Sequence, residues 1–239
     1  MPEGQPSVLV LGVYMAGRAN AVRHLVDAMR SSQYCRVFQR WVALGGPPPD
    51  DHVGSVTVVQ VAGRVAKFSL VNRMLHQDDV DQYDFILVCD DDVYLPDQWV
   101  DRFIGWQQHC NFALAQPART WDSFVDHTFV RRALFTRARE TRFVEIGPVF
   151  CMARAMARLI LPFDETSDMG WGYDLVWPVI ARANGLTLGI VDDAPVAHSM
   201  RPRGAFYEMA PELESMRTYL ANNEHLKARE CFTTLRRYR

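Results

Sequence analysis

The chain lacks three features that would assign it to a specialised class of protein. None of its apolar runs approaches the roughly 18 residues that a membrane-spanning helix needs, so we expect no such span. Its formal net charge is -2, whereas a nucleic-acid-binding protein would normally be strongly basic, so we expect no nucleic-acid partner. It also contains no internal repeat and no low-complexity stretch. What remains is a globular protein of ordinary composition, with 49% hydrophobic and 23% charged residues.

The sequence also lacks any pairing of its cysteines. There are five, an odd number, and they are scattered without a C-x-x-C pair: Cys35, Cys89, Cys110, Cys151 and Cys231. Neither a zinc knot nor a disulfide framework fits this pattern, which is typical of reduced thiols in a cytosolic protein. The first residues lack the basic segment and the cleavage site of a secretory signal. We therefore predict a cytoplasmic protein.

Apolar patterns along the chain predict strands that alternate with helices. Residues 7–15 and 84–89 are continuous apolar runs, which suit parallel strands buried on both faces. Further strands are predicted at residues 35–44, 55–61, 143–149 and 186–191, and helices at residues 20–32, 67–76, 153–161 and 173–184, after Pro96, and from about residue 208. We predict a single α/β domain over residues 1–239, with a mainly parallel central sheet flanked by helices and a helical extension over residues 205–239.

Three consecutive aspartates, Asp90, Asp91 and Asp92, follow the predicted strand at residues 84–89. Carboxylates this close together repel one another and raise one another's pKa. A divalent cation such as Mg²⁺ or Mn²⁺ removes that penalty, because both metals favour hard oxygen ligands. The position points the same way, since ligands of open α/β sheets bind beyond the carboxyl ends of the strands. The alternative is a turn whose acids cap the following helix.

The segment FILVCDDDVYLP resembles the apolar strand and DxD motif of GT-A glycosyltransferases. The resemblance implies a single Rossmann-like GT-A domain that holds a nucleotide-sugar donor, most simply a UDP-sugar, through Mn²⁺ or Mg²⁺. It also implies that Asp92 is the main metal ligand and that Asp90 lies nearer the nucleoside, while Asp91 could serve either role. Two later motifs bear on this interpretation.

The sequence GWGYD, residues 170–174, places a glycine-flanked tryptophan ahead of an acid. Sugar transfer with inversion needs a base, because the acceptor hydroxyl loses its proton as it attacks the anomeric carbon. The segment is similar to the Trp-Gly-rich segment of inverting GT-A enzymes, whose closing acid is that base. The resemblance implies a catalytic role for Asp174 and an acceptor contact for Trp171, whose indole could stack on a sugar ring. Alternatively, Asp174 only stabilises a helix start and Trp171 belongs to the core.

His198 follows a short predicted strand and a proline-containing turn, in the sequence VDDAPVAH. Many GT-A enzymes take a metal ligand from a histidine at this place, so the resemblance implies that His198 joins Asp92 on the cation. A lone histidine is otherwise more often structural, and an imidazole ligand would favour Mn²⁺ somewhat over Mg²⁺. Asp192 and Asp193, just before it, either support the site or form a turn.

The order of these motifs over residues 67–198 is similar to that of a little-characterised GT-A-like family found in bacteria and plants. The arginine-rich middle of the chain, from QPART to RETRF, departs from the pattern of that family. The resemblance therefore implies no acceptor contact in this middle segment.

Four further residues are candidates for donor binding. Val13 and Asn20 lie on the first predicted strand and the loop after it, where GT-A enzymes bind the base and the ribose. Arg18 lies on the same loop and Lys67 begins a predicted helix, so either could contact phosphate; core packing for Val13 and solvation for the two cations are the alternatives. Glu145 lies on a predicted buried strand and needs a partner there. It either binds acceptor hydroxyls or pairs with an arginine of the middle segment.

The C-terminal residues 225–239 are basic, which favours either a solvated surface or a weak contact with anionic lipid headgroups. The second alternative would place the protein at the inner membrane face, with a glycan or lipid-linked acceptor. We predict a metal-dependent, inverting glycosyltransferase that acts in bacterial surface glycan or related glycoconjugate synthesis. Two alternatives stay open: a sugar-nucleotide nucleotidyltransferase, whose glycine-rich loop is only thinly represented by GVYMAGRANA, and a non-catalytic nucleotide-sugar-binding module.

Overall fold

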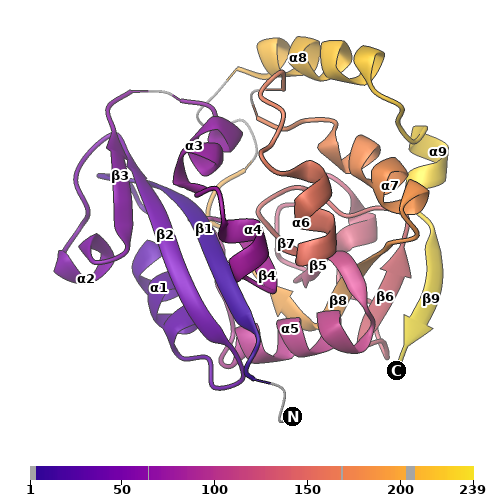
Figure 1. Cartoon of the computed structure of the whole chain (residues 1–239), viewed down its shortest axis with the longest axis horizontal. Helices are drawn as coiled ribbons and strands as arrows, with labels where there is room; N and C mark the ends of the chain where they lie inside the picture. The colour runs from indigo at the N-terminus through magenta and orange to yellow at the C-terminus, as the bar shows by residue number, and fades with distance from the viewer. Residues whose placement is uncertain (1–3, 64, 168, 203–207) are drawn as a thin grey trace.

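The computed structural model describes residues 4–63, 65–167, 169–202 and 208–239. Within them the strands form one nine-stranded mixed sheet with helices on both faces (Figure 1). Across the sheet the strands follow the order β3-β2-β1-β4-β7-β5-β8-β6-β9. Their bounds are β1 Ser7–Met15, β2 Arg36–Leu44, β3 Thr57–Val61, β4 Phe85–Asp90, β5 Phe112–Arg119, β6 Ala138–Thr141, β7 Val149–Ala153, β8 Thr187–Val196 and β9 Thr234–Tyr238.

The helices connect these strands or follow them. Their bounds are α1 Val22–Arg30, α2 Asp51–Gly54, α3 Lys67–Met74, α4 Asp79–Gln82, α5 Trp99–His109, α6 Arg154–Ile160, α7 Tyr173–Ala183, α8 Met209–Asn222 and α9 Ala228–Cys231, with a short 3-10 helix η1 at Thr128–Val130. No helix among the described residues combines the length and the apolar character that a bilayer crossing requires.

The first four strands form a parallel block whose apolar residues point to both faces. β1 pairs in parallel with β2 and with β4, and β2 pairs in parallel with β3. On β1, Val8 and Val10 belong to one core cluster while Leu9 and Leu11 belong to the other, because successive side chains of a strand point to opposite faces. The strand predicted at residues 7–15 is confirmed.

The remaining strands make the sheet mixed, so the prediction of a mainly parallel sheet is wrong. β7 runs antiparallel between β4 and β5, and β6 runs antiparallel to both β8 and β9, while β5 and β8 form a further parallel pair. Parallel pairing needs a long crossover, which is usually a helix. The chain instead reaches β6 and β7 through loops and η1, so these strands are not held to the parallel direction.

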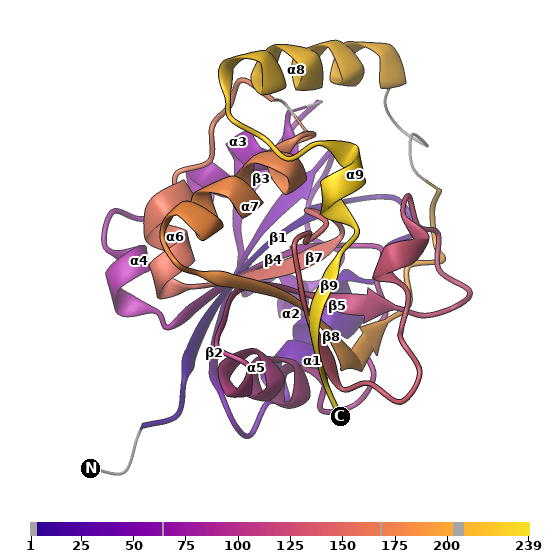
Figure 2. The same ribbon diagram turned by 90° about the vertical axis from the view of Figure 1, so that its right-hand side faces the viewer.

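Helices cover both faces of the sheet. α1 and α5 pack on one face through a core cluster that includes Val26, Trp99 and Phe103. α3, α6 and α7 pack on the other face through a cluster that includes Phe68 and Trp177. Figure 2 shows the two helical layers on either side of the strands. α8 lies apart from both layers, across one end of the molecule (Figures 1 and 2).

Two local predictions differ from the structure. The strand predicted at residues 143–149 begins only at Val149, because Pro148 has no N–H to donate and the residues before it form a loop. The extension predicted to be helical over residues 205–239 ends in the strand β9, which pairs with β6. Its basic residues Arg236 and Arg237 therefore lie on an edge strand. The part of that extension before residue 208 lies outside the described residues.

Candidate active site

A cavity of about 1220 Å³ opens at the carboxyl ends of the parallel strands. β1 contributes Val13 and Met15, β2 ends there with Leu44, and β4 delivers Asp90. This is the edge at which open α/β sheets bind ligands. The loop before β7, the start of α7 and the helix α8 also line the cavity, so it joins segments that lie far apart in the sequence.

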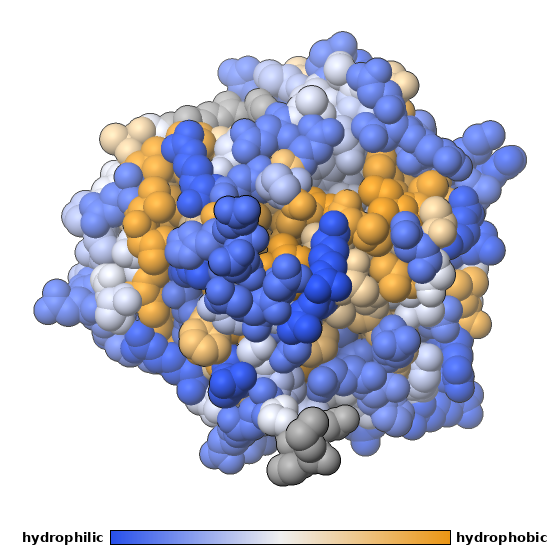
Figure 3. Space-filling view, viewed as in Figure 1, coloured by the Kyte–Doolittle hydropathy of each residue, from blue (hydrophilic) through white to orange (hydrophobic). Residues whose placement is uncertain are grey.

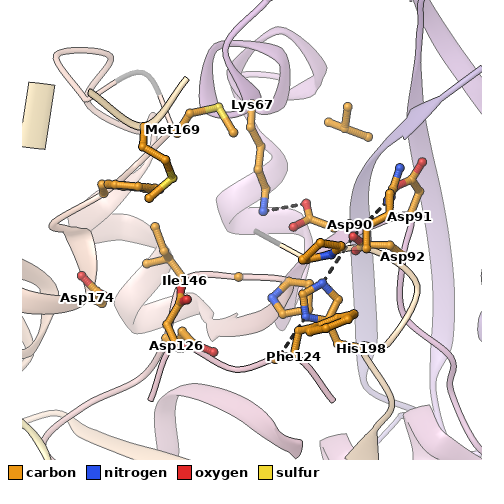
Figure 4. A pocket seen from close by; sticks show the side chains of 18 of the residues that line it. Lys67, Asp90, Asp91, Asp92, Phe124, Asp126, Ile146, Met169, Asp174 and His198 are labelled. Atoms are coloured by element: carbon orange, nitrogen blue, oxygen red, sulfur yellow. Dashed lines mark hydrogen bonds and ion pairs between the residues drawn. The ribbon is translucent and has the colours of Figure 1, made fainter. Parts of the chain in front are cut away.

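The three aspartates at the end of β4 have three different sets of partners (Figure 4). Asp90 pairs with Lys67, with 2.7 Å between Oδ1 and Nζ. Asp91 is buried, and its Oδ2 accepts a hydrogen bond of 2.7 Å from the backbone N–H of Met15. Asp92 faces His198, with 3.3 Å between Oδ2 and Nε2. The end of β4 and the late histidine motif therefore meet in one place.

An arginine outside the sequence motifs, Arg201, ties two of these carboxylates together. Its Nη2 donates to Oδ1 of Asp91, and its Nε donates to Oδ2 of Asp92 over 3.2 Å. A guanidinium carries a fixed fork of N–H donors, which suits two neighbouring carboxylates. The only sequence signal for this contact was the position of Arg201 shortly after His198.

Burial and counter-charges shift the pKa values of Asp91 and Asp92 in opposite directions. Burial raises the pKa of Asp91 to about 6, although the positive charge of Arg201 opposes this rise. Burial also acts to raise the pKa of Asp92, but the hydrogen bond and charge of His198, together with Arg201, hold that pKa below its usual value. Asp92 is therefore the member of this pair that better keeps a negative charge for a cation.

Asp92 and His198 fit a divalent cation as two of its ligands. Oδ1 of Asp92 is buried without a hydrogen-bond partner among the described residues, so its lone pairs are unused. Nδ1 of His198 lies 3.3 Å from the carbonyl oxygen of Phe124, which can only accept a hydrogen bond, so Nδ1 is the donor. A bound cation would replace the Nε2 proton that faces Asp92, while Nδ1 keeps its proton toward Phe124, which is how ligating histidines are oriented. The described part of the chain has no cluster of three such ligands, so donor oxygens and water would complete the coordination.

Three of the four predicted donor residues outside the triplet line the cavity. Lys67 is the first residue of α3, and its side chain extends between the triplet and the opposite side of the cavity (Figure 4). Val13 and Arg18 also line the cavity. Asn20 is not among the lining residues: its amide nitrogen donates to the carbonyl oxygens of Met15, at the end of β1, and of Arg18, 2.9 Å from each. Asn20 therefore shapes the loop that carries Arg18.

The opposite side of the cavity carries Asp174, in the first turn of α7. Two glycines before it, Gly170 and Gly172, have φ angles of +73° and +97°, which L side chains rarely adopt. A Cβ at Gly170 would lie 2.1 Å from the ring of Phe68, so the chain approaches α3 this closely only without a side chain. Burial raises the pKa of Asp174 to about 7, against backbone hydrogen bonds that act to lower it. Trp171, from the same motif, lines the cavity as well.

Two more carboxylates line the cavity. Oε2 of Glu145, in the loop before β7, lies 3.5 Å from Nη2 of Arg119, while Oε1 is buried without a hydrogen-bond partner among the described residues. Burial raises the pKa of Glu145 to about 7, against the positive charge of Arg119. Asp126, which the motifs did not indicate, comes from the segment between β5 and β6 and lies beside Ile146 (Figure 4). Glu145 has both a structural partner and an unused oxygen, so both of its predicted roles stand.

The arginine-rich middle segment supports the sheet at two points outside the cavity. Nε of Arg139 donates to Oδ2 of the buried Asp192 over 2.9 Å. Nη1 of Arg137 pairs with Oδ1 of Asp193 over 2.5 Å. Neither aspartate lines the cavity. The two acids before the late histidine lie within β8 and pair with arginines of the middle segment, so the prediction that they form a turn is wrong.

The fold is similar to that of the crystal structure of GalNAc-T7 with UDP, GalNAc and Mn²⁺. The TM-score is 0.60 at 11% sequence identity, and the match covers 92% of this chain and 48% of the other, so this chain spans about half the length of that one. The likeness supports a GT-A-like fold. No protein-family model matches the sequence, and no curated protein matches it either. At this identity the likeness concerns the fold alone.

Proposed function

We propose that this chain is a metal-dependent glycosyltransferase that moves a sugar from a nucleoside-diphosphate donor to a hydroxyl acceptor with inversion. The observation that carries the proposal is one cavity with two chemically different sides. One side, here called the charged wall, consists of Lys67, Asp90, Asp91, Asp92, His198 and Arg201. The other side carries Asp174. The UDP and Mn²⁺ named for the GalNAc-T7 structure make these two the first candidates for donor nucleotide and metal.

The charged wall would bind the diphosphate. Asp92 and His198 would hold the cation, which would offset the negative charge that develops on the departing diphosphate. Nζ of Lys67 lies 2.7 Å from Asp90 and can turn toward a phosphate oxygen in the same space. Arg18 is a second candidate for such a contact, since its loop borders the cavity. Asp91, which is buried and held by Met15 and Arg201, would fix the turn after β4.

Asp174 would accept the proton of the attacking hydroxyl. A general base works best when its pKa lies near the working pH, and the pKa of Asp174 is about 7. Inversion requires the acceptor to attack from the side opposite the leaving diphosphate, so the base and the metal belong on different sides of the cavity. Glu145, whose pKa is also raised to about 7, is the alternative base.

Thermal unfolding with nucleotides tests the donor side of the proposal. A ligand that binds only the folded state raises its Tm. We expect UDP, or another nucleoside diphosphate, to raise the Tm when Mn²⁺ is present and to have little effect in EDTA. Absence of any shift with UDP, GDP, CDP or ADP in Mn²⁺ would contradict the proposal.

The products formed from the stabilising nucleotide-sugar test the reaction itself. Release of a nucleoside diphosphate together with a glycosylated acceptor supports the proposal. Release of pyrophosphate from a nucleoside triphosphate and a sugar phosphate would identify a nucleotidyltransferase instead. Donor binding without either product would identify a non-catalytic binding module. A place in bacterial surface glycan synthesis stays a prediction from the sequence.

A further inference from the structure

The side of the cavity around Asp174 carries an apolar surface next to its carboxylates Asp126 and Glu145, in contrast to the charged wall. Six residues form what we call the apolar wall: Met169, Trp171, Leu175, Met209, Leu213 and Met216. The first three flank Asp174 along the chain, and the last three come from α8. The cavity volume of about 1220 Å³ also exceeds the roughly 300–1,000 Å³ of sites for one small ligand. There is room for a second molecule beside a donor.

α8 presents an apolar stripe to the cavity. Met209, Leu213 and Met216 recur at the spacing that places side chains on one face of a helix. Farther along α8, Tyr219 is buried in the core cluster that includes Phe68 and Trp177, and Leu220 packs against the same cluster. The C-terminal part of the helix therefore holds α8 in place. Leu213 keeps 37% of its surface exposed. The face of α8 that Figure 3 presents is mostly hydrophilic, whereas Met209, Leu213 and Met216 line the cavity.

The apolar wall suits a hydrocarbon group better than a sugar chain. Specificity for a polar ligand comes from a few well-placed hydrogen-bonding groups, whereas this wall consists of thioethers, methyl groups and one indole. Methionine is unbranched and polarisable, so the three methionines can adapt to an apolar group of irregular shape. Apolar surface in contact with water is unfavourable by about 25 cal/mol per Å². A bound apolar group would remove water from the wall.

We propose that the acceptor carries an apolar group close to the hydroxyl that receives the sugar, and that this group binds against the apolar wall. The inference rests on the proposed function, because it places the acceptor hydroxyl at Asp174. Trp171 and Leu175 line the cavity together with Asp174, so a hydroxyl that reaches this carboxylate brings the group attached to it next to the wall. The acceptor class is a hydrophobic glycoside or alcohol, with either an alkyl chain or an aryl group.

Titration calorimetry with methyl, octyl and phenyl β-glucopyranoside tests the inference, because the three share a sugar and differ in the attached group. Burial of one methylene changes affinity roughly fourfold, so burial of three methylenes gives about 60-fold. We expect octyl or phenyl glucoside to bind about 60-fold more tightly than methyl glucoside, below the concentration at which octyl glucoside forms micelles. A preference for octyl indicates an alkyl acceptor, and a preference for phenyl indicates an aryl acceptor. Equal binding of all three overturns the inference.

Leu213→Gln and Met216→Gln test where the apolar group binds. Each should weaken binding of the preferred glucoside about tenfold, because an amide replaces apolar contact surface. Leu159→Gln is the matched control: Leu159 is a helical leucine on α6, 40% exposed, that does not line the cavity. The control should bind as the wild type does, and the Tm of each variant reports whether the fold is intact. Folded variants of Leu213 and Met216 that bind like the wild type would overturn the inference.

Stabilisation by nucleoside diphosphates with Mn²⁺ separates a failure of the inference from a failure of the proposed function. Stabilisation without any preference among the glucosides contradicts the apolar acceptor alone. A preference among the glucosides without nucleotide binding contradicts the proposed function, and the assignment of the apolar wall to an acceptor is overturned with it.

Discussion

The two sides of the cavity shift the pKa values of Asp92 and Asp174 in opposite directions. On the charged wall, Lys67 pairs with Asp90, and Arg201 pairs with both of the aspartates that follow. On the other side, Asp174 lies beside apolar residues, and burial raises its pKa to about 7. Cationic partners keep a carboxylate ionised, whereas burial favours its neutral form. The same residue type is therefore suited to bind a cation on one side and to transfer a proton on the other.

Glu145 shows that a cationic neighbour alone does not decide this difference. It has Arg119 as a partner, yet burial raises its pKa to about 7. Arg119 is fully buried, and burial also lowers the pKa of its own guanidinium. Asp92 differs because His198 and Arg201 both act on it. The number and closeness of the cations, set against the degree of burial, decide which carboxylate stays charged.

The largest expected effect comes from removing the charge of Asp92. Asp92→Asn puts an amide where the cation needs a carboxylate, so Mn²⁺-dependent transfer should fall by about 10⁴-fold, equivalent to several kcal/mol of lost charge stabilisation. Mn²⁺ binding in the presence of UDP, followed by electron paramagnetic resonance, should weaken in parallel. Asp193→Asn is the control, because Asp193 pairs with Arg137 outside the cavity. Near-wild-type transfer by Asp92→Asn would contradict the assignment of the charged wall.

The second prediction tests Asp174, on the other side of the cavity, as the general base. Asp174→Asn should lower kcat by about 10³-fold, because a positioned base contributes roughly 10²–10⁴, while UDP binding stays unchanged. In the wild type, kcat/KM should rise as the pH increases through about 7, because the base acts only when it is ionised. Glu145→Gln should keep this pH profile and Asp174→Asn should lose it. The reverse result would move the base to Glu145.

The parallel block was open to prediction from sequence because its local signals agree with its surroundings. β1 is apolar on both faces, and β4 runs directly into a charged triplet at the ligand-binding edge. β5 gave no comparable signal, since FALAQPAR contains small alanines, a proline and polar residues instead of β-branched ones. β9 is exposed at its three central residues and carries two arginines, so its extended form depends on pairing with β6. Because β6 and β9 lie far apart in the sequence, their pairing is set by the tertiary structure and gives no local sequence signal.

The candidate site also has parts that could be predicted from the sequence and parts that could not. The motif order predicted that Asp92 and His198 would meet, and the structure places them 3.3 Å apart. The contacts of Arg201 could not be predicted, because they depend on where the chain goes after β8. The stripe of Met209 and Leu213 resembles any helix face that packs on a core. That it faces a cavity follows from the position of α8 across the end of the molecule.

The third prediction tests how Arg201 affects the charged wall. Arg201 and a divalent cation use the same carboxylates, so Arg201→Met should let Mn²⁺ bind about tenfold more tightly in the absence of a donor, since two neighbouring carboxylates lose their counter-charge. Calorimetric Mn²⁺ titration measures this change. Arg217→Met is the control, because Arg217 lies on α8 with a 72% exposed side chain and does not line the cavity. Unchanged or weaker Mn²⁺ binding by Arg201→Met would show that the arginine does not compete with the metal.

The smallest expected effect is on the free energy of unfolding, measured by urea unfolding in EDTA. Variants on the two sides of the cavity should change it in opposite directions at pH 8. The pKa of Asp174 rises from about 3.9 in the unfolded chain to about 7 in the folded one. Between these values the folded state binds more protons, so the free energy of unfolding falls as the pH rises from about 4 to 7. Asp174→Asn should therefore be more stable than the wild type at pH 8, by about 2 kcal/mol after allowance for screening at the cavity, and equal to it near pH 4.

Asp92 should show the opposite sign. Its pKa is lowered in the folded state, so it contributes stability above the unfolded value of about 3.9 that is lost as the pH falls below it. Asp92→Asn should therefore be less stable than the wild type at pH 8, while the difference shrinks in acid. Stability changes of the same sign for Asp92→Asn and Asp174→Asn at pH 8 would mean that folding does not shift the pKa values of Asp92 and Asp174 in opposite directions.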